Sequence, residues 1–130
     1  MNSSPSLLEQ LGGTRVLEKI IHDFVGRVFD DIMIGYLFRK VDRSRLERLE
    51  SQLAAQFLGA PVNYQGRPLD KAHASHRIMG GQFARRKQIL SETLQHHQVP
   101  ETIQKAWLEH TESLRSQITA DSGGNCSRSE

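Results

Sequence analysis

The chain has 130 residues, with 17 Lys and Arg, 15 Asp and Glu, and 37% apolar residues, which is typical of one globular domain. No apolar run approaches the roughly 18 residues of a membrane span, and no signal-peptide pattern opens the chain, so we expect a cytoplasmic protein without a membrane partner. The net charge of +2 is too small to indicate a nucleic-acid partner. Basic clusters such as 85–87 lack interleaved aromatic residues for base stacking, so we interpret most of them as solvated helix faces. A single cysteine, Cys126, excludes an intramolecular disulfide.

The first long helix is expected from Thr14, as the N-cap after two glycines, to Asp30. Its apolar residues recur at steps of three and four, which predicts one broad buried stripe. An irregular stretch follows as far as Phe38. The stripe comprises Val16, Leu17, Ile20, Ile21, Phe24, Val25, Val28 and Phe29.

Asp42 is the expected N-cap of the next helix, which runs to about Leu58. Glu50 is anomalous because it shares a seam with apolar residues while the polar residues occupy the opposite face. A carboxylate in that position is partnered, protonated or directed into a ligand cavity. The seam comprises Leu46, Leu49, Glu50, Leu53, Ala54 and Phe57.

The second half of the chain predicts a Gly- and Pro-rich loop at 59–68, a short helical stretch, and two further helices. One runs from about Gly81 to His97, and the last follows Pro100 as a first-turn proline. No segment alternates with period two, so the fold class is all-α with five or six helices. We expect a flexible N-terminus at 1–6, one domain at 7–118 and a polar, disordered tail at 119–130. The apolar lines of the two helices contain Phe83, Arg86, Leu90, Leu94 and His97, and then Ile103, Ala106, Trp107, His110, Leu114 and Ile118.

Histidines are the most informative polar residues, because common catalytic and phosphate-binding motifs are absent. His110 lies on an apolar line, which favours a hydrogen-bonded core histidine over a metal ligand. His73 and His76 are three residues apart and share a helix face. The pair could hold a divalent metal with a nearby acid, one member could ligate haem, or both could be surface residues.

Eight short segments keep a common order and spacing, essentially without gaps. They are 7–13 (LLEQLGG), 24–31 (FVGRVFDD), 36–38 (YLF), 45–46 (RL), 57–61 (FLGAP), 64–73 (YQGRPLDKAH), 82–83 (QF) and 99–100 (VP). In this register the chain resembles the group-one truncated haemoglobins, small globins whose helices form a two-over-two sandwich around haem. Each segment alone is weak evidence of the family, whereas their combined order and spacing are specific. The resemblance extends from about residue 7 to residue 118.

The resemblance implies that His73, which follows the Gly-Arg-Pro-Leu loop, is the proximal ligand of the iron in haem b. It implies that Phe38 stacks on the porphyrin, and that Leu69 and Phe83 pack the proximal side and the haem edge. His76, one turn on, lies beside the haem propionates in one reading and is an exposed bystander in the other.

The distal side departs from the family pattern. Most relatives carry Phe-Tyr in the B helix, where the tyrosine hydroxyl donates a hydrogen bond to bound oxygen, whereas this chain has Phe-Val. On the next helix, leucines occupy positions that often hold polar or ligating residues, and a glutamate stands where glutamine is common. An arginine takes a haem-facing position that is usually apolar. The expected distal residues are Phe24, Val25, Leu46, Leu49, Glu50 and Arg86, of which Leu46, Leu49 and Arg86 also contact the haem.

An ionised carboxylate repels the partial negative charge on bound oxygen, so stable oxygen carriage is less favoured here than in typical relatives. Opposite charges at inward positions on neighbouring helices predict an ion pair between Glu50 and Arg86 over the haem, with Arg86 as donor to a bound ligand. In the alternative, the aliphatic parts of the Glu50 and Arg86 side chains are buried and both charged groups reach water.

The sequence therefore predicts a haem-binding truncated globin that binds, transports or redox-converts small ligands such as oxygen, nitric oxide or carbon monoxide. Activity of the nitric-oxide dioxygenase kind needs an electron donor, such as a reductase, that the sequence does not encode. A monomer or weak dimer is expected. The alternatives are a haem-free globin-fold module that works through helix contacts, and a divalent-metal protein that uses His73 and His76.

Overall fold

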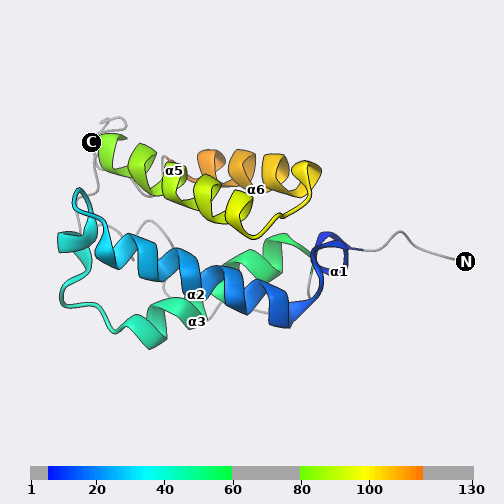
Figure 1. Cartoon of the computed structure of the whole chain (residues 1–130), viewed down its shortest axis with the longest axis horizontal. Coiled ribbons are helices and arrows are strands. Elements are labelled where there is room, and N and C mark those ends of the chain that lie inside the picture. The colour runs from blue at the N-terminus through cyan, green and yellow to red at the C-terminus, as the bar shows by residue number, and fades with distance from the viewer. Residues whose placement is uncertain (1–5, 60–79, 116–130) are drawn as a thin grey trace, which may run out of the picture.

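The computed structural model describes residues 6–59 and 80–115, and every regular element in these two ranges is helical. Helices α2 and α3 form one pair, while α5 and α6 lie side by side as a second pair packed over α2 (Figure 1). The expected all-α class with two layers of paired helices is therefore confirmed. In chain order the elements are α1 (Leu7–Leu11), α2 (Thr14–Asp30), the 3-10 helix η1 (Gly35–Phe38), α3 (Arg43–Phe57), α5 (Gly80–His96) and α6 (Glu101–Ser113).

Helix α2 lies at the centre of the core because it packs against both α3 and α5. Its stripe is buried as expected from Leu17 onward, whereas Val16 in the first turn is 36% exposed and Phe29 is half-buried. No helix in the described ranges has both the length and the apolar content needed to cross a bilayer. The stripe residues that are at most 3% exposed are Leu17, Ile20, Ile21, Phe24, Val25 and Val28.

The helix ends follow local capping chemistry, with two corrections. The side chain of Asp42 accepts a hydrogen bond from the Arg45 backbone N–H at 3.2 Å, so the predicted N-cap of α3 is confirmed. Thr14 is not an N-cap, because it is already helical and Gly13 holds the capping position. Gly13 has a φ of 94°, a conformation that side-chain-bearing residues rarely adopt. Pro100 likewise precedes the first turn of α6 as its N-cap.

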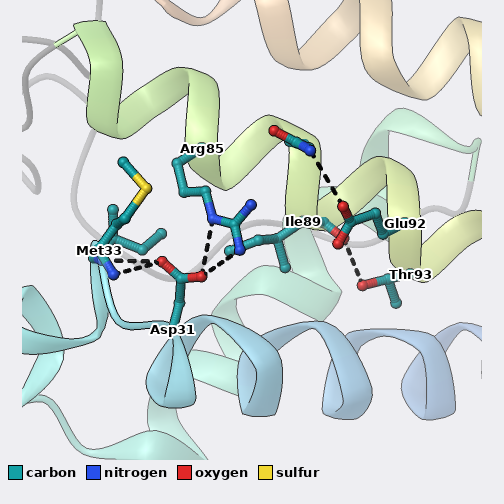
Figure 2. Close-up of polar contacts among 8 residues, drawn as sticks. Asp31, Met33, Arg85, Ile89, Glu92 and Thr93 are labelled. Carbon is teal, nitrogen blue, oxygen red and sulfur yellow. Dashed lines mark hydrogen bonds and ion pairs between the residues drawn. The ribbon is translucent and has the colours of Figure 1, made fainter.

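Asp31 links the turn that follows α2 to helix α5, through Arg85 (Figure 2). One carboxylate oxygen accepts the backbone N–H groups of Met33 and Ile34 at 3.0 and 3.1 Å, and the other accepts Nε and Nη2 of Arg85 at 2.9 and 2.6 Å. The side chain of Asp31 is only 4% exposed, and the hydrogen bonds from Arg85 are the main cause that lowers its pKa.

The basic cluster at 85–87 is therefore only partly a solvated face, because Arg85 and Arg86 have largely buried acidic partners whereas Lys87 and Glu112 remain partly exposed. Arg85 binds Asp31, and Lys87 pairs with Glu112 on α6 at 3.0 Å. The solvated-face interpretation was wrong for Arg85, because its acidic partner lies 54 positions away in the sequence.

Candidate functional site

A cavity of about 50 Å³ lies where α2, α3, α5 and α6 meet. A volume of this size accepts a few water-sized or diatomic molecules. Its wall is mostly apolar, with a small number of polar groups, which is the usual character of a small-ligand site. The lining residues are Ile21, Phe24, Glu50, Leu53, Ala54, Arg86, Leu90, Trp107, His110, Thr111 and Leu114.

Glu50 and Arg86 form an ion pair in the wall of this cavity. Arg86 Nη2 donates to both carboxylate oxygens of Glu50, at 3.0 Å each. The two side chains are 16% and 19% exposed, for Arg86 and Glu50 respectively, so most of each lies out of water. Of the two sequence alternatives, the structure contains the ion pair. Pairing offsets much of the cost of burying the two charges.

The pairing geometry leaves part of Arg86 available. A single nitrogen makes both bonds to Glu50, and among the described residues no hydrogen bond engages Nε or Nη1. The guanidinium also lies over the ring of Phe24, with Cζ 5.1 Å from the ring centroid, which helps to fix its plane. The cavity wall therefore holds a positioned cation whose Nε and Nη1 donate to no group within residues 6–59 and 80–115.

His110 contributes a third polar group to the cavity wall. Its ring stacks on Phe57 with centroids 4.1 Å apart and an interplanar angle of 7°. Burial lowers the pKa of His110, which favours the neutral ring. The expected hydrogen bond is absent within residues 6–59 and 80–115, where stacking takes its place.

The structure brings only part of the expected distal set into the cavity. Phe24, Glu50 and Arg86 line it, whereas Val25 is buried elsewhere in the core at 1% exposure. Leu46 and Leu49 are half-buried on α3 and do not line this cavity.

The two expected haem-contact phenylalanines pack against apolar side chains, and the guanidinium of Arg115 also lies over the ring of Phe83, with Cζ 4.9 Å from the ring centroid. Phe38 is half-buried, and its ring stacks on Phe29 with centroids 5.7 Å apart. Phe83 is fully buried and packs with Leu37 and Leu114. The other expected haem residues, Leu69, His73 and His76, lie outside the described ranges.

Sequence reasoning placed Leu53, Trp107 and Leu90 in the core without recognising them as cavity residues, and it missed Thr111. The helical register contains a signal for two of them. Leu53 follows Glu50 by three residues and Leu90 follows Arg86 by four, so each shares a face with a charged residue. Within the described part of the chain, no group of three or more His, Cys, Asp or Glu is arranged to hold a metal ion.

Comparison with known proteins gives a consistent result. A family model described as bacterial-like globin matches residues 6–120. The group 1 truncated hemoglobin GlbN of Nostoc commune is 24% identical over 113 residues, which cover 87% of this chain and 96% of that protein. GlbN of Synechocystis sp. is 28% identical over 102 residues, covering 75% of this chain and 82% of the relative.

Solved structures share the fold. The truncated hemoglobin of Tetrahymena pyriformis in its Fe(III) form superposes with a TM-score of 0.82 at 20% identity, covering 88% of this chain and 98% of that one. The group II truncated hemoglobin of Bacillus anthracis gives a TM-score of 0.82 at 18% identity, covering 98% and 97%.

Proposed function

Because the chain belongs to the bacterial-like globin family, whose members bind haem and small ligands such as oxygen, we propose that it binds haem b through His73. A small ligand such as oxygen, nitric oxide or carbon monoxide then occupies the cavity beside Glu50 and Arg86. The haem iron supplies the coordination position for that ligand. The observation that carries the proposal is the ion pair set into the wall of a small, mostly apolar cavity.

The described residues suit a flat, apolar cofactor. Leu46, Leu49 and Phe57 on α3, and Phe38 on η1, are all half-buried, so each keeps some apolar surface that a cofactor could cover. Glu50 and Arg86 are paired with each other, so each offsets the charge of the other toward a neighbouring macrocycle. Cofactor pockets commonly combine such an apolar lining with a few positioned polar groups.

Arg86 takes the role of hydrogen-bond donor that a tyrosine fills in relatives. Its Nε and Nη1 groups are the available donors, and its stacking on Phe24 and bonding to Glu50 hold it in place. Glu50 accepts from Arg86, so its carboxylate charge is partly neutralised toward a ligand. Redox conversion of a ligand requires an external electron donor, such as a reductase.

Absorption spectroscopy of the purified protein with added haem tests the proposal. We expect an intense Soret band in the wild type, its loss in His73→Ala because the axial nitrogen is removed, and its retention in His76→Ala. The exposed His96 offers a second control, since His96→Ala removes an imidazole that does not line the cavity.

Other outcomes would contradict the assignment. No spectral change on adding haem to the wild type would favour a haem-free module. Divalent-metal binding that both His73→Ala and His76→Ala abolish would favour the metal-protein alternative.

A further inference from the structure

Three large apolar side chains project into solvent from one short stretch of the chain. Ile32 is 95% exposed and Met33 is 55% exposed in the turn after α2, and Tyr36 is 51% exposed on η1. Within the described ranges, the other exposed large apolar residue is Val16, at 36% in the first turn of α2. Covering apolar surface is favourable, so three such side chains on one turn indicate a contact surface.

This turn is held in a fixed shape, so the exposure of Ile32 and Met33 follows from the fold. Asp31 accepts the backbone N–H of Met33 at 3.0 Å. The hydroxyl oxygen of Tyr36 accepts a hydrogen bond from Nε2 of Gln82 on α5 at 2.6 Å. A contact surface that is ordered before binding loses less conformational entropy when a partner arrives.

Positive charge is concentrated directly after η1. The segment 39–48 contains five basic and two acidic residues, so its net charge of +3 exceeds the +2 of the whole chain. Arg39 and Lys40 are exposed, and neither forms an ion pair with a residue in 6–59 or 80–115. Figure 1 places the turn after α2, η1 and the start of α3 at the same end of the molecule. We call this end the docking surface, and it comprises Ile32, Met33, Tyr36, Arg39 and Lys40.

The charge pattern around the docking surface favours a protein partner over a lipid membrane. Asp30 and Asp42 are exposed carboxylates, and they stand just before the turn and just after Lys40. The uniform negative charge of an anionic lipid surface would repel both, whereas a protein can place its own charges to suit both signs. The excess of basic residues then selects a mainly acidic partner.

Helix η1 connects the docking surface with the interior. Tyr36 faces solvent, whereas Phe38, two residues on, is half-buried and stacks on Phe29. Phe38 is the residue expected to stack on the porphyrin. A partner at the docking surface is therefore separated from the expected haem contact by one short helix.

Resting on the proposed haem site, we propose that the docking surface receives a small, acidic one-electron donor protein that carries an iron–sulfur cluster. One electron leaves the reduced cluster, which is oxidised, and reaches the ferric iron, which becomes ferrous. No covalent bond forms or breaks in this step, and no proton moves. Complexes for electron transfer have small interfaces, which suits an apolar centre of three side chains, and they are steered by charge.

Titration of the haem-loaded ferric protein with an acidic plant-type ferredoxin at low salt tests the charged part of the surface. We expect the double variant Arg39→Glu with Lys40→Glu to weaken binding about 10- to 100-fold, because like charges then face each other. Arg15→Glu with Lys19→Glu is the matched control, since it changes the net charge equally. Both control residues are exposed on α2 and have no ion-pair partner in the part of the chain that the structure describes.

The apolar part of the surface is tested in the same titration. The double variant Ile32→Ser with Met33→Ser should weaken ferredoxin binding about 10-fold, because it removes the apolar area that the partner covers. Val16→Ser should leave binding unchanged, since Val16 lies in the first turn of α2 and the docking surface follows its last turn.

The rate of reduction provides a second readout. In anaerobic stopped-flow mixing with reduced ferredoxin, the Arg39→Glu, Lys40→Glu variant should be reduced about 10- to 100-fold more slowly than the Arg15→Glu, Lys19→Glu control. The difference should shrink as salt is added, because the Debye length falls from about 10 Å at 0.1 M to about 3 Å at 1 M.

Equal ferredoxin affinity in the wild type and the Arg39→Glu, Lys40→Glu variant, in proteins with matching Soret bands, would overturn this inference alone. An equal loss in the Arg15→Glu, Lys19→Glu control would also overturn it, by reducing the effect to net charge. Binding of the wild type to anionic phospholipid vesicles and not to ferredoxin would overturn it in favour of a membrane surface. Failure of the wild type to bind haem would overturn the proposed function, and with it the electron-transfer role.

Discussion

Replacement of Arg86 by leucine should accelerate the dissociation of oxygen from the ferrous protein about 10- to 100-fold. A hydrogen bond from a charged donor in a partly buried site contributes about 1.5–3 kcal/mol, and each 1.4 kcal/mol corresponds to a factor of ten. The substitution also leaves the carboxylate of Glu50 without its partner, which adds repulsion toward the partial negative charge on oxygen. Stopped-flow replacement of oxygen by carbon monoxide measures the rate.

Lys87→Met provides the matched control, because Lys87 is the next residue on α5 and pairs with Glu112 outside the cavity wall. Arg86→Lys retains the charge and should recover part of the effect. If Arg86→Leu proves too unstable because Glu50 is left unpaired, the double variant with Glu50→Leu removes both charges. An oxygen dissociation rate equal to that of the wild type in Arg86→Leu, or in its double variant with Glu50→Leu, would exclude Arg86 as the donor.

Asp31→Ala should lower the free energy of unfolding by about 3 kcal/mol, or roughly 10 °C in the melting temperature. The substitution removes the acceptor for two backbone N–H groups in the turn after α2 and breaks the link to Arg85 on α5. Chemical denaturation at pH 7 measures the loss. Asp30→Ala is the control, since Asp30 is the exposed neighbour and forms no ion pair with the described residues.

The stability difference between the wild type and Asp31→Ala should also depend on pH. The folded-state pKa of Asp31 is lowered, so the ionised group stabilises the fold fully above the ordinary aspartate pKa of about 3.9, and the benefit is lost as the pH falls through the lower folded-state value. Asp23, Glu47 and Glu112 also have lowered pKa values, but both proteins contain them and their contributions cancel in the comparison. A difference that stays constant down to pH 2 would contradict this account of Asp31.

Local sequence patterns were sufficient to predict most of the helices. The three-four spacing on α2 and the Asp42 cap on α3 depend on neighbours within one or two turns, and both were identified from the sequence. Thr14 was misplaced because glycines with positive φ already turn the chain at that point, which leaves no capping role for the hydroxyl.

The candidate site was predictable where a residue violated its own helix pattern. Glu50 stood out in an apolar seam and Arg86 on an apolar line, and the resemblance placed Arg86 inward on a neighbouring helix, so opposite charges at these positions predicted the pair. The contribution of Thr111 and the stacking of His110 on Phe57 depend on how α6 packs against α3, which no local spacing encodes. For the same reason, the link between Asp31 and Arg85 emerged only from the tertiary structure.

The carbon–oxygen stretching frequency of the ferrous carbon monoxide complex tests the central claim most directly, because it reports the electric field that the cavity applies to a haem-bound ligand. A positive donor near the ligand oxygen lowers this frequency, and an unpaired carboxylate raises it. We predict a lower frequency in the wild type than in Arg86→Leu, with Lys87→Met matching the wild type. The same frequency in the wild type and Arg86→Leu would contradict the assignment of Arg86 and Glu50 to the ligand cavity of a haem protein.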